Sequence, residues 1–297
     1  MLNTHTVRTA RAERFFDGLN LIVLAIVSLC FLIPFLVVFG TSFISEAEFA
    51  RRSFILWPEA PVLDSYMSIF ARSGVLARAY SVSVFRITVG VLFNLFFTAT
   101  YAFAISRPRL PGKTFFTLFL FMTTILSGGL IPGFLIVKYT GVYGTIWSLV
   151  VPGLINAWWL LIMRNFFATI PIDLEEAAII DGATPFQTLA KVFLPLSLPS
   201  IATIGLFYAV QHWNSWFDAL IFLPDESMHP IQMILRKVIV NASIGSADIM
   251  SQSAGYTPPA ESLKSAVIIV TTLPILVVYP FLQRYFVKGV LVGGVKG

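Results

Sequence analysis

Charged residues and cysteine are both scarce in this sequence of 297 residues. Asp, Glu, Lys and Arg together make up only 12% of it, against about 25% in a typical soluble domain. Because 57% of the residues are hydrophobic and the mean hydropathy is +0.84, we predict an integral membrane protein. The single cysteine, Cys30, lies within an apolar run, which excludes a disulfide framework and a cysteine metal site.

Motifs for metal, hydrolytic or nucleotide chemistry are also missing. The three histidines, His5, His212 and His229, lack metal-ligand spacing, and neither HExxH nor Gly-x-Ser-x-Gly occurs. Gly112-Lys113-Thr114 looks like the end of a phosphate-binding loop, but Arg107 stands where that loop requires its first glycine. We therefore expect no metal site, no catalytic residue and no cofactor bound by this chain, which is not itself an enzyme.

Six apolar runs are long enough to cross a membrane, since about 30 Å of hydrocarbon requires about 20 helical residues. The first run is too long for a signal peptide and lacks a small-x-small cleavage site, so we interpret it as a retained anchor. The sequence thus predicts an all-α membrane protein with six transmembrane helices and both termini on one side. The runs lie at residues 19–42, 79–105, 114–137, 144–163, 197–222 and 265–287.

Basic residues in the short loops indicate the orientation. Arg107, Arg109 and Lys113 occupy one tight turn with no acid, and the arm 1–18 carries three arginines against two acids. Both segments, and with them both termini, are predicted to face the cytoplasm, with 19–297 as a single transmembrane domain. Since the net charge of +5 is spread over such loops, we expect lipid contact and no nucleic acid.

Two longer segments, 45–78 and 224–264, are then external. Proline residues exclude a long helix from the first segment, whereas the second segment contains a helix-like stretch from Ile231 to Val240. A connection of about 40 residues exceeds the usual length of about 4–6 and is more often functional than filler. A passive lid is the plain alternative.

The longest polar interruption on the cytoplasmic side is the loop 171–195, between the fourth and fifth runs. Asp173 followed by Glu176 fits a capping box that starts a first helix. Gly182 offers the left-handed conformation that ends a helix, and the stretch 184–187 (TPFQ) repeats the start signal with proline at the first helical position. We therefore predict two short helices joined at a glycine.

The second helix of this loop is predicted to have one apolar face. Phe186, Leu189, Ala190 and Phe193 recur at i, i+3, i+4 and i+7, and Leu194-Pro195 is expected to stop the helix. Each helix is too short to span a bilayer. By capping and periodicity alone, the loop could be an ordinary hairpin between two membrane helices.

The same loop carries a longer pattern, which consists of Glu176-Ala177-Ala178, Asp181-Gly182-Ala183, Val192 and Leu194-Pro195. This pattern closely resembles the EAA signature of ABC importer permeases. Leu189 replaces the usual Phe of that signature and Val192 the usual Ile, which are apolar exchanges of similar shape. In that family the loop is the coupling helix, which docks into a cleft on a cytoplasmic ATPase and transmits its closure to the membrane helices. The resemblance marks as coupling residues Glu175, Glu176, Ala177, Ala178, Asp181, Gly182, Ala183, Leu194 and Pro195.

Two further strings, SGGLIP at 127–132 and IMRNFF at 162–167, resemble the branch of maltose-type permeases that handles oligosaccharides and polysaccharide fragments of alginate or rhamnogalacturonan type. The resemblance implies the permease subunit of an importer in the bacterial cytoplasmic membrane, working by alternating access. It implies a heterodimer with a second, related permease, an ATPase dimer that binds ATP and Mg, and an extracytoplasmic solute-binding protein. By the same resemblance, segment 224–264 would contact that binding protein.

Polar and aromatic residues within the spans are candidates for the cargo pathway. Arg86 lies about 10 Å below the external end of the second span, at 1.5 Å per residue. It should face the bundle or a wet cavity, where it would suit an acidic uronate sugar, unless it snorkels outward. Amides and indoles also suit sugars, because they hydrogen-bond hydroxyl groups and pack on pyranose faces. These candidates are Asn94, Asn156, Trp158, Gln211, Trp213 and Asn214.

Each pathway feature has an alternative reading. An interfacial aromatic belt explains Trp213 and Trp216 without a ligand. Another helix, rather than a sugar, is the alternative partner for Asn94 and Asn156. The breaks at Gly128-Gly129 and Pro152-Gly153 point towards a pathway, or they let helices pack closely. An ion-driven secondary transporter is the alternative function, but it would favour an acid deep in a span, and every Asp and Glu lies in a loop or near a boundary.

Overall fold

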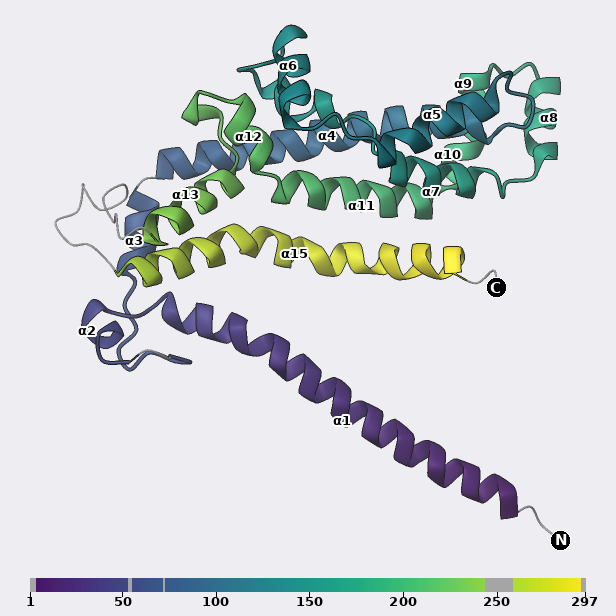
Figure 1. Cartoon of the computed structure of the whole chain (residues 1–297). Helices are drawn as coiled ribbons and strands as arrows, with labels where there is room; N and C mark the ends of the chain where they lie inside the picture. Colours follow the sequence, from purple (N-terminus) through teal and green to yellow (C-terminus); the bar gives the residue numbers. More distant parts are fainter. Residues whose placement is uncertain (1–3, 53–54, 72, 244–258, 295–297) are drawn as a thin grey trace. The chain divides into compact units, whose positions relative to one another are not determined.

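The computed structural model describes residues 4–52, 55–71, 73–243 and 259–294, and all regular structure in these ranges is helical (Figure 1). The predicted all-α class is therefore confirmed for the described chain. Contacts divide the chain into two units, Met1–Arg72 with Val238–Val270 and Ser73–Lys237 with Thr271–Gly297. We call these unit 1 and unit 2 and describe each by itself.

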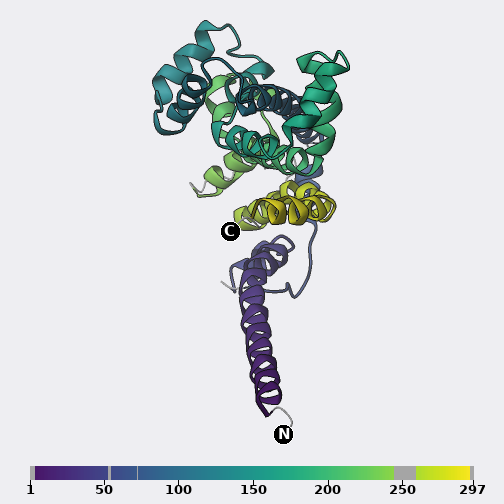
Figure 2. The same cartoon turned by 90° about the vertical axis from the view of Figure 1, so that its right-hand side faces the viewer.

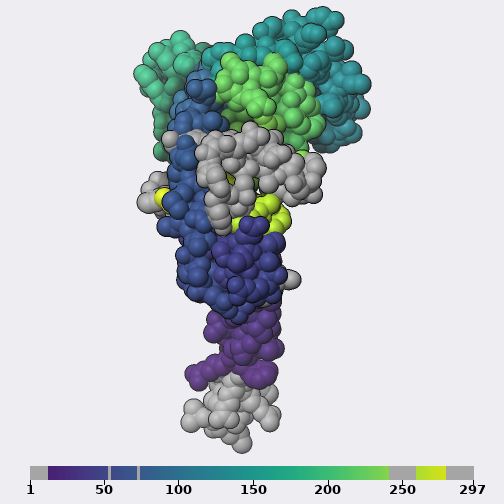
Figure 3. Space-filling model, turned by 90° about the vertical axis from the view of Figure 1, so that its left-hand side faces the viewer, coloured from purple at the N-terminus to yellow at the C-terminus, as the bar shows by residue number. Residues whose placement is uncertain are grey.

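Unit 1 begins with the long helix α1 (Thr4–Thr41), drawn in purple in Figure 3. Its apolar stretch Glu13–Thr41 is long enough to cross a membrane, and none of its most hydrophobic window is buried within the chain. The helix contains the predicted first span. Within unit 1 the apolar side chains of this window are uncovered, which is what contact with lipid or another subunit requires.

Buried hydroxyl groups hold the rest of unit 1 together. The short helices α2 (Glu46–Phe49) and α3 (Asp64–Ala71) follow α1, and α15 (Ala260–Gly294) begins in this unit. The Ser262 hydroxyl, on α15, lies 2.8 Å from that of Ser65 on α3 and donates to the Ser42 carbonyl at the end of α1. These contacts join three elements far apart in the sequence.

Unit 2 is built around α4 (Ser73–Ser106), which contains the predicted second span. Helices α7 (Ala157–Phe167) and α11 (Leu198–Asn214) pack along it (Figures 1 and 2). The core between them is mainly apolar and includes Tyr208, whose hydroxyl meets that of the buried Thr98 at 2.8 Å and accepts from the Asn156 N–H at 3.0 Å. Its most deeply buried members include Ala102, Ile105, Leu160, Met163, Phe167, Phe193 and Ile204.

Bends interrupt the predicted third and fourth spans in the structure, and another bend lies at the start of the predicted fifth span. Helix α5 (Lys113–Ile125) meets α6 (Leu130–Tyr139) at 119°, where Gly129 has a φ of +83°. The turns η1 (Ile146–Leu149) and η2 (Val151–Gly153) precede α7 at a bend of 51°, and an 88° bend separates Pro185–Leu196 from α11. The breaks at the glycine pair and at Pro152-Gly153 are those that the sequence indicates.

The remaining elements are short. Helix α8 (Ile172–Ile180) is followed by α9 (Pro185–Thr188), the π-helical turn η3 (Leu189–Phe193) and α10 (Leu194–Leu196). After α11 come α12 (Phe217–Phe222), η4 (Glu226–Met228) and α13 (Ile231–Ser243). Helix α13 confirms the helix expected from Ile231, whereas residues 244–258 of the same predicted segment lie outside the described residues.

Candidate functional site

The joint between α8 and α9 forms as the sequence predicts. Gly182 adopts a φ of +81°, and the N–H of Ala183 returns to the Ala178 carbonyl at 2.9 Å. A capping box then starts α9, since the Thr184 hydroxyl accepts from the Gln187 N–H at 3.3 Å and the Gln187 side chain accepts from the Thr184 N–H at 2.8 Å. Two helices joined at a glycine are confirmed.

The predicted capping box at Asp173 is wrong. Helix α8 starts at Ile172, directly after Pro171, and no side chain caps it. Because proline already fixes φ near its helical value, the helix begins one residue ahead of the proposed cap, and Asp173 lies in its first turn. The carboxylate of Glu176 is bonded instead to Arg109, at 2.9 Å.

The predicted apolar face of the second helix is only half right. Leu189 and Phe193 are buried, whereas Phe186 and Ala190 are exposed. In the π-helical turn η3, one extra residue enters the helical repeat. Residues before the turn therefore lie on a different face from the residues after it, and the i, i+3, i+4, i+7 spacing no longer describes one face. The helix also continues past Pro195, in the first turn of α10, to Leu196.

Helix α8 buries none of its residues within this chain. Ile179 and Ile180 are 54% and 85% exposed, and Ile172 and Leu174 are also exposed. Figure 1 shows α8 and α9 together at one end of unit 2. A short helix with several uncovered apolar side chains, at the end of a bundle, is typical of a surface that a partner protein covers.

Two ion pairs connect α8 with the basic turn that follows α4. Arg107 contacts Glu175 at 2.7 Å, with side chains that are 12% and 18% exposed. Arg109 contacts Glu176 at 2.9 Å, with side chains that are 76% and 45% exposed. The turn that indicates the cytoplasmic side by its charge therefore lies against the proposed coupling helix.

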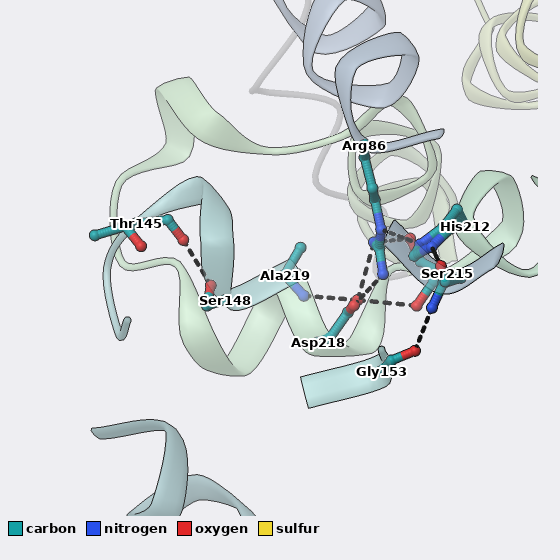
Figure 4. A network of polar contacts seen from close by, with 9 residues as sticks. Arg86, Thr145, Ser148, Gly153, His212, Ser215, Asp218 and Ala219 are labelled. Atoms are coloured by element: carbon teal, nitrogen blue, oxygen red, sulfur yellow. Dashed lines mark hydrogen bonds and ion pairs between the residues drawn. The ribbon is translucent and has the colours of Figure 1, made fainter. Parts of the chain in front are cut away.

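A buried polar network crosses unit 2 near the other end of α4 (Figure 4). Arg86 is 3% exposed and forms an ion pair with Asp218 of α12. Its Nη1 donates to the Ser215 carbonyl at 3.2 Å, and its Nε donates to His212 Nδ1 at 3.2 Å. Arg86 therefore points into the bundle, and the alternative that it snorkels outward is wrong.

The same network reaches the break before α7. Because His212 Nδ1 accepts from Arg86, its Nε2 is the donor to Asn94 Oδ1, which lies 2.7 Å away. The Asn94 amide nitrogen in turn donates to the carbonyls of Gly153 at 2.6 Å and Leu154 at 2.9 Å. One continuous set of bonds thus joins α4, α11, α12 and the broken segment η2.

In the structure, several of the cargo candidates contact other groups of this chain. Asn94 is fully buried in the network. Asn156 caps α7 by accepting from the backbone N–H groups of Trp158 and Trp159, at 3.0 and 3.2 Å. Trp213 is 8% exposed and lies against Tyr80, so it does not form part of an aromatic belt within this chain. These side chains support helices rather than lining a common cavity.

Three cargo candidates remain on the surface of the chain. Trp158 is 65% exposed, and Gln211 and Asn214 are exposed on α11. Trp216 is half-buried, with the guanidinium of Arg236 4.8 Å from its ring centroid. Of the predicted pathway side chains, the described residues bring together Arg86 and Asn94, which both bond to His212, and the others lie apart from that network.

Sequence reasoning missed His212 and Asp218 as members of the network. A signal for Asp218 was present, because it is the one acidic residue inside any of the six predicted spans. A charge such as Arg86 within a span needs a counter-ion, and Asp218 was the candidate available. Nothing comparable pointed to His212.

Gly90 lets α4 approach His212 closely, and its replacement by alanine is expected to disrupt the network. A Cβ atom at this position would lie 2.5 Å from His212 Nε2. Relieving such a contact should cost about 1–3 kcal/mol of folding free energy. Thermal unfolding of the detergent-solubilised protein measures the effect. Gly133→Ala in α6 is the control, because nothing lies within 4 Å of its Cβ position, and equal stability of both variants would contradict the prediction.

The turn after α12 has its own charge pairs. The Ser227 N–H and hydroxyl both donate to Asp225 and hold the pKa of its carboxyl below the usual value. A hydrogen bond and the charge of Lys237, 2.7 Å away, likewise lower the pKa of Glu226. Both carboxylates stay ionised. Among the described residues, no group of three or more His, Cys, Asp or Glu side chains could hold a metal ion.

Comparison with known proteins identifies the family. No protein-family profile matches the chain. The chain is 40% identical to Protein LplC of Bacillus subtilis over 100% of both chains. It is also 40% identical to the polygalacturonan/rhamnogalacturonan transport system permease protein YtcP of Bacillus subtilis, over 96% of this chain and 99% of the relative.

A solved structure shows the same fold. It is the crystal structure of a bacterial ABC transporter involved in the import of the acidic polysaccharide alginate, which superposes with a TM-score of 0.81 at 30% identity. The match covers 93% of this chain and 98% of that chain. With full-length relatives at this identity and the EAA pattern on α8 and α9, this chain belongs to the family of ABC transporter permeases.

Proposed function

We propose that this chain is the permease subunit of an ABC importer that takes up oligosaccharides, with acidic fragments of the polygalacturonan and rhamnogalacturonan type as cargo. The observation that carries the proposal is the 40% identity to a permease of polygalacturonan and rhamnogalacturonan transport across nearly the whole of both chains. The alginate importer matched in structure handles another acidic polysaccharide. The comparisons give no support to an ion-driven transporter.

The proposed membrane arrangement has six spans with both termini in the cytoplasm. Helices α1, α4 and α15 are each long and apolar enough to span. The bent pairs α5 with α6 and η1–η2 with α7 supply two further spans, and α11, the apolar part of the third bent pair, supplies the fifth. The bends fall at glycine, proline or serine, where membrane helices can break if other groups satisfy the freed backbone. The loop containing α8 and α9 then lies on the cytoplasmic side, between spans four and five.

In this arrangement the loop 171–195 is the contact with a separate ATPase dimer, which binds ATP and Mg. The exposed apolar residues of α8 support this role, because they have no covering element within the chain. The coupling residues are those of the EAA pattern, Glu175 to Ala183 with Leu194 and Pro195. Coupling requires that the two membrane conformations have different free energies for each state of the ATPase.

The other proposed partners meet different parts of the chain. The uncovered helix α1 supports contact with a second, homologous permease and with lipid, since none of its apolar window is buried within this chain. The external segments, including α13, would face the solute-binding protein that delivers the oligosaccharide. Arg86 already pairs with Asp218, so specificity for acidic cargo would have to come from other groups of the heterodimer.

Ile180→Glu is expected to remove the ATPase from the purified complex. Ile180 is the most exposed apolar residue of α8, at 85%, and a charge there would lie in the apolar contact that we propose. Burying an unpaired carboxylate costs several kcal/mol, so the amount of ATPase that co-purifies with the permease should fall at least about tenfold. The measurement is the ratio of ATPase to permease after affinity purification.

The matched control is Val75→Glu near the start of α4, an exposed apolar residue of the same unit that lies outside the loop and outside the predicted spans. It should leave the ratio of ATPase to permease in the recovered complexes unchanged. An unchanged ratio in the Ile180→Glu complex would contradict docking through α8.

A further inference from the structure

We propose that Arg107 is the positioning residue that joins the coupling helix α8 to the membrane helices. The inference rests on the proposed function, in which α8 contacts the ATPase. It adds how movement of α8 reaches the bundle: through one guanidinium that bonds to α8 and, at the same time, to the cytoplasmic ends of α4 and α7.

The bonds of Arg107 run to three elements. Its Nη1 contacts Glu175 of α8 at 2.7 Å, and its Nη2 donates to the Phe167 carbonyl at the end of α7, at 3.0 Å. Its Nε donates to the hydroxyl of Ser106, the last residue of α4, at 3.0 Å. Because guanidinium is planar and rigid, these three bonds fix the helix ends relative to one another.

The face of the guanidinium lies on buried aromatic rings. Its central carbon is 4.3 Å from the ring centroid of Phe193 in η3 and 5.4 Å from that of Phe103 in α4. Phe193 in turn meets Phe103 and Phe167 edge to face, with centroids 4.9 and 5.7 Å away. All three rings are at least nine-tenths buried. Arg107 thus rests on the core of unit 2 and also contacts the segment that continues from α9.

Packing of α8 on the rest of unit 2 is limited, because the helix buries none of its residues. We therefore expect a movement of α8 to pass mainly through its polar contacts and along the chain through α9 and η3. Arg107 lies on both routes, since it bonds to Glu175 and stacks on Phe193. The second ion pair to α8, between Arg109 and Glu176, is mostly exposed and has no aromatic support, so solvent weakens it.

The test compares Arg107→Gln with Arg109→Gln in the complete complex of both permeases, the ATPase and the binding protein, reconstituted in proteoliposomes. Both changes remove one cation from the same turn and one ion pair to α8. For Arg107→Gln, we expect normal co-purification of the ATPase but at least about a tenfold lower uptake per ATP hydrolysed. For Arg109→Gln the loss should stay below about twofold. Arg107→Lys keeps the positive charge but loses the planar guanidinium group, so its uptake per ATP hydrolysed should lie between those of the wild type and Arg107→Gln.

Glu175→Gln is a second variant, needed in case the complex with Arg107→Gln does not assemble. It removes the ion pair to α8 but leaves the packing of Arg107 on the aromatic rings intact. It should also lower the uptake per ATP. Normal coupling in Glu175→Gln, or a loss in Arg107→Gln that only follows the amount of complex recovered, would overturn the assignment. Retention of the ATPase by Ile180→Glu would instead refute docking through α8, and the role of Arg107 with it.

Discussion

Replacing Asp218 with asparagine is expected to destabilise this permease strongly, because Arg86 would keep its charge within the bundle without a counter-ion. Arg86 is 3% exposed, and Asp218 is the acid with which it pairs. Removing one member of a buried ion pair typically costs about 3–5 kcal/mol. Thermal unfolding of the solubilised protein and its yield from membranes measure the loss.

Two comparisons separate this effect from that of an ordinary lost carboxylate. Asp225→Asn makes the same chemical change in the exposed turn η4 and should shift the unfolding midpoint little. The double variant Arg86→Gln with Asp218→Asn removes both charges and should recover part of the stability lost by Asp218→Asn alone. The account of the network would be wrong if the two asparagine variants were equally stable, or if the double variant were less stable than Asp218→Asn.

Gly182→Ala is expected to abolish most of the transport while leaving the membrane bundle folded. Gly182 has a φ of +81°, which costs a residue with a Cβ about 1–2 kcal/mol. No atom lies within 4 Å of the Cβ position, so the penalty is conformational and acts on the angle between α8 and α9. Because that angle sets how the loop meets the ATPase, we expect uptake per ATP to fall about tenfold.

Gly182→Asn provides the matched control, since asparagine adopts left-handed conformations far more readily than alanine. It should retain most of the uptake although its side chain is larger. The measurement is binding-protein-dependent uptake and ATP hydrolysis in the same proteoliposomes. Wild-type coupling by Gly182→Ala, or an equal loss in both variants, would show that the left-handed joint is not what matters.

The local structure of the coupling loop was largely predictable, because its signals are local. A glycine followed by Thr-Pro-x-Gln specifies a helix end and a helix start with little help from the rest of the fold. The capping box at Asp173 failed because Pro171 started the helix one residue before the proposed cap. The prediction of one apolar face was partly wrong because no sequence signal indicates the π-helical turn η3.

The cargo candidates show where sequence reasoning reached its limit. Amides within a span need partners, and for Asn94 both a sugar and another helix meet that need. The break at Pro152-Gly153 frees backbone carbonyls, and the structure pairs these with the Asn94 amide instead. Each observation was correct by itself, but only the three-dimensional arrangement shows that the two features satisfy each other.

Uptake of labelled oligogalacturonides into proteoliposomes tests the central claim most directly. The vesicles would contain this chain, its partner permease and the ATPase, with the binding protein outside and neutral oligosaccharides as the comparison. We predict uptake that requires internal ATP and the binding protein, favours the acidic sugar and survives an uncoupler. Uptake that proceeds without nucleotide and collapses with the uncoupler would contradict the account and indicate an ion-driven carrier.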